Sequence, residues 1–173
     1  SNNVINSDID TSGNIFSITE ATGNANNLLV KFDSNGNLLW QKGIQYSSYE
    51  TFASYIDVWP DNSILMCGDY EKSDAAGYFF AKYDNNGNQL WIKTVEYNTF
   101  PGKYIDKIIA TADGGFVAKG EAWDSEDTDL GYLVRFDAQR NLVWEKFLKA
   151  GTDETYIYDI LMNANNEIVI SGF

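Results

Sequence analysis

The segment LLVKFDSNGNLLWQK, residues 28–42, sets the pattern of the chain. It recurs as FFAKYDNNGNQLWIK at 79–93 and as YLVRFDAQRNLVWEK at 132–146. Each copy has an apolar run, an aspartate, a polar turn and a tryptophan. These aspartates and tryptophans are Asp33, Trp40, Asp84, Trp91, Asp137 and Trp144. The tryptophans are 51 and 53 residues apart, a period typical of stacked supersecondary units. We therefore expect a repeat protein in which the tryptophans are packing residues.

A second hairpin motif lies between the copies of the first. Its turn pairs are Ser12-Gly13, Asp61-Asn62, Asp113-Gly114 and Asn165-Asn166. The second member is always Gly or Asn, which tolerate positive φ and therefore indicate a two-residue hairpin turn. The pairs Asn35-Gly36 and Asn86-Gly87 of the first motif follow the same rule. The pair Gln139-Arg140 departs from it and predicts a different turn.

Alternating residues predict strands, as in Leu28, Val30 and Phe32 on one side and Lys31 on the other, and no stretch has a helical pattern. The expected order is strand, tight turn, strand, long loop, repeated along the chain. Complete four-stranded units are expected at about 3–44, 54–97 and 104–149, with half a unit at about 156–173. Successive turns of an antiparallel meander fall on opposite edges, so the long loops share one edge. We expect any ligand there.

Four antiparallel strands per unit of about fifty residues resemble the blades of a β-propeller. The segments KFDSNGNLLW and KYDNNGNQLW are similar to the aspartate, glycine, tryptophan signature of quinoprotein-like propellers and of repeat propellers in bacterial surface and secreted proteins. This resemblance implies an all-β, partial propeller over residues 1–173, with about three and a half blades and tryptophans docked between blades. It also implies an extracellular or cell-envelope location.

A propeller needs at least four blades. We therefore expect the remaining blades to come from the same polypeptide, in preference to a second copy of the chain. An open blade face would otherwise expose an unusually large apolar patch.

Composition excludes several classes of function. Twenty-five acidic against twelve basic residues give a net charge of −13, which disfavours nucleic acid as a partner. No apolar run is long enough to span a membrane. Histidine is absent, which removes the usual imidazole base, and the single cysteine, Cys67, is expected to be a buried thiol.

Aromatic residues in or beside the long loops are the candidate binding residues, because rings with a polar edge suit protein or carbohydrate ligands. They are Tyr46, Tyr49, Tyr97, Phe100 and Trp123. The alternative is that these rings fill gaps between blades.

The loop from Glu121 to Asp129 is the most acidic segment. Its candidate metal ligands are Asp124, Glu126, Asp127 and Asp129. Such a loop could supply several of the oxygens that Ca²⁺ needs, although the spacing differs from that of the twelve-residue calcium loop. The alternative is a solvated loop. The segment Asp33 to Asn37 also has acidic and amide residues, but Asn-Gly hairpin chemistry accounts for it.

No nucleophile with a base, phosphate-binding loop or Cys and His metal cluster is recognisable. The sequence therefore favours a non-catalytic binding or scaffold module of a secreted or surface-exposed bacterial protein. The alternative is a fragment of an enzyme propeller, either a quinone-dependent dehydrogenase or a polysaccharide-active enzyme.

Overall fold

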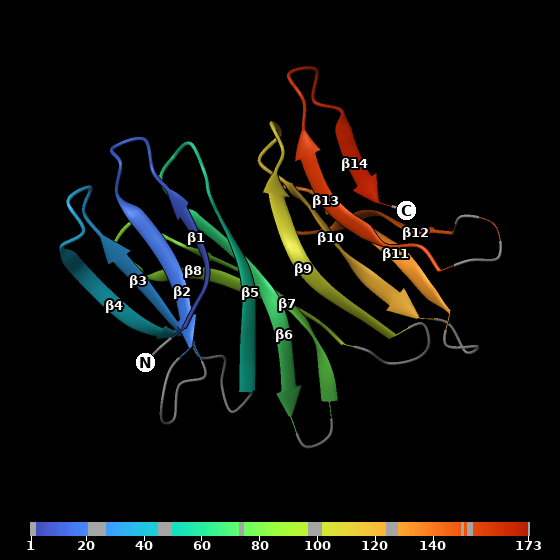
Figure 1. Cartoon of the computed structure of the whole chain (residues 1–173), viewed down its shortest axis with the longest axis horizontal. Helices are drawn as coiled ribbons and strands as arrows, with labels where there is room; N and C mark the ends of the chain where they lie inside the picture. Colours follow the sequence, from blue (N-terminus) through green and yellow to red (C-terminus); the bar gives the residue numbers. More distant parts are fainter. Residues whose placement is uncertain are drawn as a thin grey trace. The chain divides into compact units, whose positions relative to one another are not determined.

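The computed structural model describes residues 3–20, 27–44, 50–72, 75–96, 102–123, 128–149, 151 and 154–172. These residues form fourteen β-strands in four sheets, and within each sheet every strand pairs antiparallel with its neighbours in sequence (Figure 1). Within this described part of the chain, no helix is long and apolar enough to cross a membrane. The chain divides into two compact units, Ser1–Glu96 and Tyr97–Phe173.

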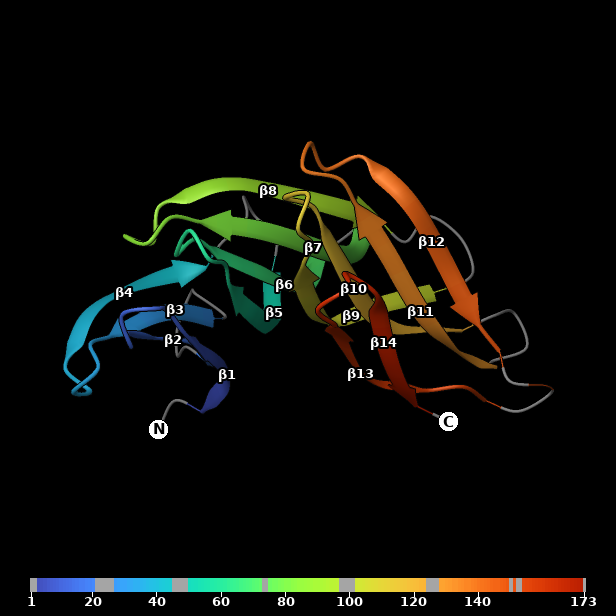
Figure 2. The ribbon, with the colours of Figure 1, turned by 90° about the horizontal axis from the view of Figure 1, so that it is seen from above.

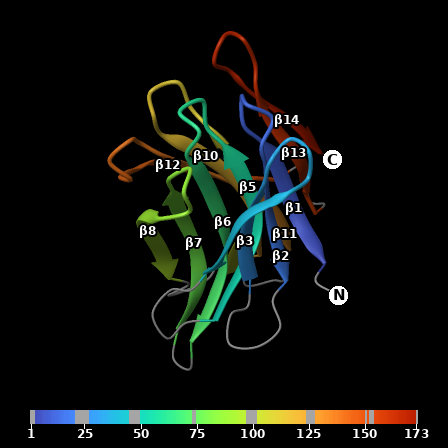
Figure 3. The same cartoon turned by 90° about the vertical axis from the view of Figure 1, so that its left-hand side faces the viewer.

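The first unit holds two four-stranded sheets, each with its strands in chain order (Figure 2). The strands are β1 (Val4–Ile9), β2 (Ile15–Glu20), β3 (Asn27–Phe32) and β4 (Leu38–Ile44), followed by β5 (Glu50–Val58), β6 (Ile64–Lys72), β7 (Ala75–Tyr83) and β8 (Gln89–Glu96). Figure 3 views this unit from the side, with the first sheet in blue to cyan and the second in teal to green.

The second unit holds one four-stranded sheet, β9–β12, and a two-stranded sheet. Its strands are β9 (Gly102–Ala110), β10 (Phe116–Trp123), β11 (Asp129–Phe136), β12 (Leu142–Leu148), β13 (Ile157–Met162) and β14 (Ile168–Gly172). The prediction of an all-β chain of antiparallel four-stranded repeats is therefore confirmed at the level of its sheets.

The tight turns share one backbone geometry, which differs from the predicted two-residue turn. In the β3–β4 turn, the amide of Asp33 donates to the carbonyl of Asn37 at 2.9 Å, and that of Gly36 donates to the carbonyl of Asp33 at 3.0 Å. Gly36 has a φ of +83°, whereas Asn35 is not in the left-handed region. This is a type I turn followed by one left-handed residue, the three-residue hairpin loop, rather than the two-residue loop with two left-handed residues.

An aspartate begins four of the seven tight turns in the described residues, and its carboxylate reinforces this geometry. Oδ1 of Asp33 accepts the amides of Asn35 and Asn37, and Oδ2 accepts the side-chain amide of Asn37 at 2.8 Å. Asp84 with Asn88 and Asp10 with Asn14 repeat these contacts. A side chain that replaces backbone hydrogen bonds in this way stabilises the turn locally.

The prediction that Gln139-Arg140 makes a different turn is wrong. Arg140 has a φ of +68°, and its amide donates to the carbonyl of Asp137 at 2.9 Å, as Gly36 donates to Asp33. Asn141 donates its main-chain and side-chain amides to the carboxylate of Asp137. The aspartate and asparagine at the two ends of the turn therefore impose the conformation, even on an arginine.

The core of the first unit lies between its two sheets. Phe16, Ile18 and Leu29 of the first sheet pack against Ile64 and other buried residues of the second. The partly buried Trp40 packs on this cluster, with its ring centroid 6.1 Å from that of Phe16 in an edge-on arrangement. The motif tryptophan therefore contributes to packing between successive sheets in this unit.

Side chains of the first sheet also cover the outer edge of strand β5. Asn27 Oδ1 accepts the amide of Ala53 at 2.8 Å, and Asp8 Oδ2 accepts the amide of Val58 at 2.7 Å. These acceptors satisfy backbone groups that an edge strand leaves unpaired. The two sheets are thus joined by polar contacts as well as by the apolar core.

Candidate functional site

Most of the predicted ligand residues lie outside the described part of the chain. These are Tyr46, Tyr49, Tyr97, Phe100, Asp124, Glu126 and Asp127. Trp123 and Asp129 are described, and both lie at the edge of the β9–β12 sheet that is opposite its tight turns. The calcium prediction for Asp124, Glu126, Asp127 and Asp129 stays a prediction.

The predicted loop from Glu121 to Asp129 is wrong at both of its ends. Glu121 and Trp123 belong to strand β10, and Asp129 begins strand β11. The two strands stay in register here, with Glu121 opposite Gly131 and Trp123 opposite Asp129. Strand pairing therefore continues from Phe116 to Trp123 along β10.

Asp129 is held by the segment that precedes β13. The hydroxyl of Tyr156 donates to Oδ2 of Asp129 at 2.6 Å, and the amide of Thr155 donates to the Asp129 carbonyl at 3.0 Å. The same hydroxyl lies 2.8 Å from Oε2 of Glu154. These hydrogen bonds to Asp129 and Glu154 raise the pKa of Tyr156 well above its ordinary value. The phenol has a single proton, so its hydroxyl donates to one of these two carboxylates at a time, and the contact with Asp129 is the shorter.

A second tyrosine and carboxylate pair lies at the same edge. Tyr104 on β9 is opposite Glu121 on β10. Burial and then a hydrogen bond to Glu121 raise the pKa of the Tyr104 hydroxyl far above its ordinary value, with Asp129 adding to the effect. We call these residues together the acidic edge. It consists of Tyr104, Glu121, Trp123, Asp129, Glu154 and Tyr156.

Lys103 of the second unit is paired with a carboxylate that does not belong to the acidic edge. Lys103 pairs with Glu145 at 2.9 Å and lies 5.0 Å from the ring centroids of Tyr132 and Phe147. Although burial acts to raise it, the pKa of Glu145 is lowered overall by the hydrogen bond and charge of Lys103. The acidic edge therefore combines three carboxylates with three aromatic rings and is chemically distinct from this ion-paired surface.

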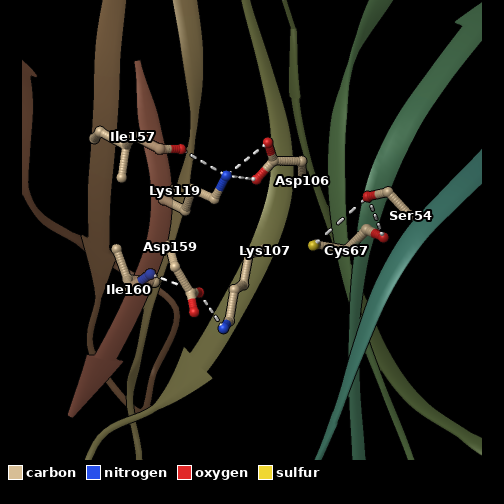
Figure 4. A network of polar contacts seen from close by, with 8 residues as sticks. All are labelled: Ser54, Cys67, Asp106, Lys107, Lys119, Ile157, Asp159 and Ile160. Atoms are coloured by element: carbon tan, nitrogen blue, oxygen red, sulfur yellow. Dashed lines mark hydrogen bonds and ion pairs between the residues drawn. The ribbon is translucent and has the colours of Figure 1, made fainter. Parts of the chain in front are cut away.

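An ion pair between the buried Lys119 and the partly buried Asp106 lies in the second unit and was not predicted from the sequence (Figure 4). Lys119, which is 6% exposed, contacts the carboxylate of Asp106 at 2.8 Å and donates to the carbonyl of Ile157 at 2.8 Å. Burial raises the pKa of Asp106, and Lys119 opposes that effect. The pair links β9 and β10 to β13. The only signal in the sequence is a lysine within the apolar pattern of β10, at the repeat position occupied by Cys67 in β6.

Cys67 is fully buried, as predicted, and its backbone carbonyl accepts the hydroxyl of Ser54 at 3.3 Å. Ser54 and Cys67 occupy the repeat positions of Asp106 and Lys119. This pair of positions is polar in both sheets but carries charge in only one of them. The Cys67 sulfur also lies 4.0 Å from the Ser54 hydroxyl oxygen, and its complete burial agrees with a small packing residue.

The described residues include no cluster of three or more carboxylate, cysteine or histidine ligands arranged around a common point. The oxygens of Asp33 are committed to the turn amides, which also hold the pKa of Asp33 below its ordinary value, first through the Asn37 side chain. This agrees with the hairpin interpretation of Asp33 to Asn37.

No protein-family model matches the chain, and no curated protein matches it.

Proposed function

We propose that this chain is a non-catalytic binding module of β-propeller type, from a secreted or surface-exposed bacterial protein. Its four-stranded meanders, the core between successive sheets and the contact of Trp40 with that core support blades as the building unit. The propeller assignment also rests on the repeated aspartate, glycine and tryptophan motif. The location rests on the same resemblance.

The observation that carries the proposal is the composition of the acidic edge. Hydroxyl and ring groups of Tyr104 and Tyr156 lie beside Glu121, Asp129 and Glu154. A sugar chain offers hydroxyl donors for such carboxylates and apolar faces for such rings. The net charge of −13 disfavours polyanions. A neutral carbohydrate is therefore the ligand class that fits this edge best.

Binding to immobilised neutral polysaccharides, measured with the full chain, tests the proposal. We expect saturable binding that weakens at least about tenfold in Trp123→Ala and in Tyr156→Ala, because each removes a ring from the edge. Leu90→Ser is the matched control, since Leu90 is 56% exposed and lies at the start of β8. Equal loss of affinity in the control, or no binding to any member of the panel, would contradict the assignment of the edge.

The same experiment separates binding from catalysis. Incubation with each bound polysaccharide should leave its chain length unchanged, and addition of pyrroloquinoline quinone with Ca²⁺ should produce no alcohol oxidation. Turnover in either assay would favour the alternative, a fragment of an enzyme propeller.

A further inference from the structure

Strand β14 exposes residues that the other sheets bury. Val169 is 44% exposed and Ile170 is 40% exposed. They follow the left-handed Asn166 by three and four residues, as Leu65 and Met66 of β6 follow the left-handed Asn62. Leu65 and Met66 are fully buried. In the described residues β14 pairs only with β13, whereas β2, β6 and β10 each pair on both sides. An apolar strand with one free edge is suited to accept another strand.

A pocket of about 220 Å³ lies beside this strand, within the second unit. Its lining includes Val117, Arg135, Met162 and Ile168. Arg135 donates to Asp113 at 2.8 Å through a terminal nitrogen. Its Nε is buried and has no hydrogen-bond partner among the described residues. A buried donor without an acceptor is costly, which points to an acceptor supplied by an occupant of the pocket.

The first unit shows how a hairpin fills the corresponding place. There, the β7–β8 turn lies against the preceding sheet, and Asn85 Oδ1 accepts a hydrogen bond from Lys31. Asn88 Oδ1 accepts one from Lys42 at 3.0 Å. A Cβ added to Gly87 would lie 2.8 Å from the ring of Trp40, so only a glycine allows this approach. The turn is thus recognised by two cations and one tryptophan.

The last copy of the motif presents the same three groups. Arg135, Trp144 and Lys146 occupy the positions of Lys31, Trp40 and Lys42 in the fifteen-residue repeat. Trp144 is partly buried against the apolar cluster of Val117, Leu133, Ile157 and Ile160. The recognition surface for a turn of the type Asp-Asn-Asn-Gly-Asn is therefore present.

The pocket also matches the strand that leads into such a turn. In the first unit, Tyr83 ends strand β7, is 5% exposed and lies opposite Ile64 of β6. Ile168 holds the repeat position of Ile64, and it lines the pocket. An aromatic residue that ended a strand paired with β14 would therefore enter the pocket beside Arg135.

We propose that the free edge of β14, with Arg135 and Trp144, is a docking site for a β-hairpin with the chemistry of β7–β8. The first strand of this hairpin adds antiparallel to β14 and places an aromatic side chain in the pocket. The turn places an amide oxygen at Arg135 Nε and a glycine on Trp144. The hairpins of this type in the described chain are paired within their own sheets, so the occupant is a segment outside these residues. This site is independent of the acidic edge.

A synthetic peptide that copies residues 75–96, with a fluorescent label, tests the proposal against the full chain. We expect saturable binding by fluorescence anisotropy below about 1 mM peptide. Hydrogen exchange of β14 amides should slow in the complex. The same peptide with Gly87→Val is the matched control and should bind at least about tenfold more weakly, because its side chain would meet Trp144.

Two variants of the chain locate the site. Val169→Glu changes an exposed residue of β14 and should weaken the peptide at least about tenfold, because it places a charge at the new strand contact. Lys149→Met, beyond the end of β12, should leave peptide affinity unchanged. Equal affinity for both peptides, or absence of saturation, would overturn the proposal. Self-association of the chain that Val169→Glu abolishes, without peptide binding, would assign the surface to a second copy and would also overturn it.

Discussion

The contact between Gly87 and Trp40 allows a matched pair of glycine substitutions. Gly87 and Gly36 occupy the same position of the same turn, with φ of +72° and +83°. Replacing either with alanine costs about 1–2 kcal/mol, because an L-residue is strained in the left-handed region. A Cβ at Gly36 meets nothing within 4 Å, whereas one at Gly87 lies 2.8 and 2.9 Å from Trp40 and 3.1 Å from Lys42. Overpacking at Gly87 should add about 1–3 kcal/mol.

Urea unfolding of Gly36→Ala, Gly87→Ala and the unchanged chain, followed by far-UV circular dichroism, measures the difference. We expect Gly87→Ala to be less stable than Gly36→Ala by the overpacking contribution alone. Removing the ring with Trp40→Ala should abolish that difference in a double-mutant cycle, because the alanine then has no ring to meet. Equal losses for the two glycines, or a difference that persists without Trp40, would refute packing of this turn on the tryptophan.

Three further predictions concern stability. Lys119→Met leaves the partly buried Asp106 carboxylate without its cation and should cost about 1–3 kcal/mol at pH 7. Burial raises the folded-state pKa of Asp106 above its ordinary 3.8, so its contribution to stability is present below pH 3.8 and is lost as the pH rises through the folded-state pKa. Without Lys119 the folded-state pKa of Asp106 rises further, so the stability lost on ionisation of Asp106 is larger. Thermal melting should therefore show a smaller effect of Lys119→Met near pH 4 than at pH 7. Equal effects at the two pH values would argue against the ion pair. Arg140→Gly should raise the free energy of unfolding by about 0.5–1 kcal/mol, because glycine adopts the φ of +68° without the strain that an L-residue has there. A loss of stability would show that contacts of the Arg140 side chain outweigh this strain. Trp40→Ala should cost about 3–5 kcal/mol, whereas Trp123→Ala at the sheet edge should leave the melting temperature nearly unchanged, and similar melting shifts would contradict the assignment of Trp40 to the core.

Local chemistry made much of the strand and turn pattern predictable. Alternating apolar residues and the fifteen-residue repeat located the strands, and left-handed φ was correctly expected at Gly36, Gly87 and Asn62. The prediction failed at Arg140 because residue preference was weighed without the aspartate and asparagine that close the turn. That aspartate and asparagine pair is itself visible in the sequence, four residues apart.

The candidate site was predictable only in part. The acidic segment around Trp123 drew attention to Asp129, but Tyr156 and Glu154 come from a segment 25 or more residues away along the chain. Their approach depends on the packing of the strand that follows them. No periodicity in the sequence records it.

The sequence by itself determined the strands, the turns and the order in which they form sheets, because these depend on neighbours within a few residues. Tertiary structure alone decided which sheet faces meet. It brought Gly87 onto Trp40, Lys119 to the carbonyl of Ile157 and Arg135 to the wall of a pocket. Each of these arrangements joins residues about 30 to 50 positions apart, and each depends on one rigid sheet packing against another. Such contacts follow from the shapes of whole faces, to which many side chains contribute at once.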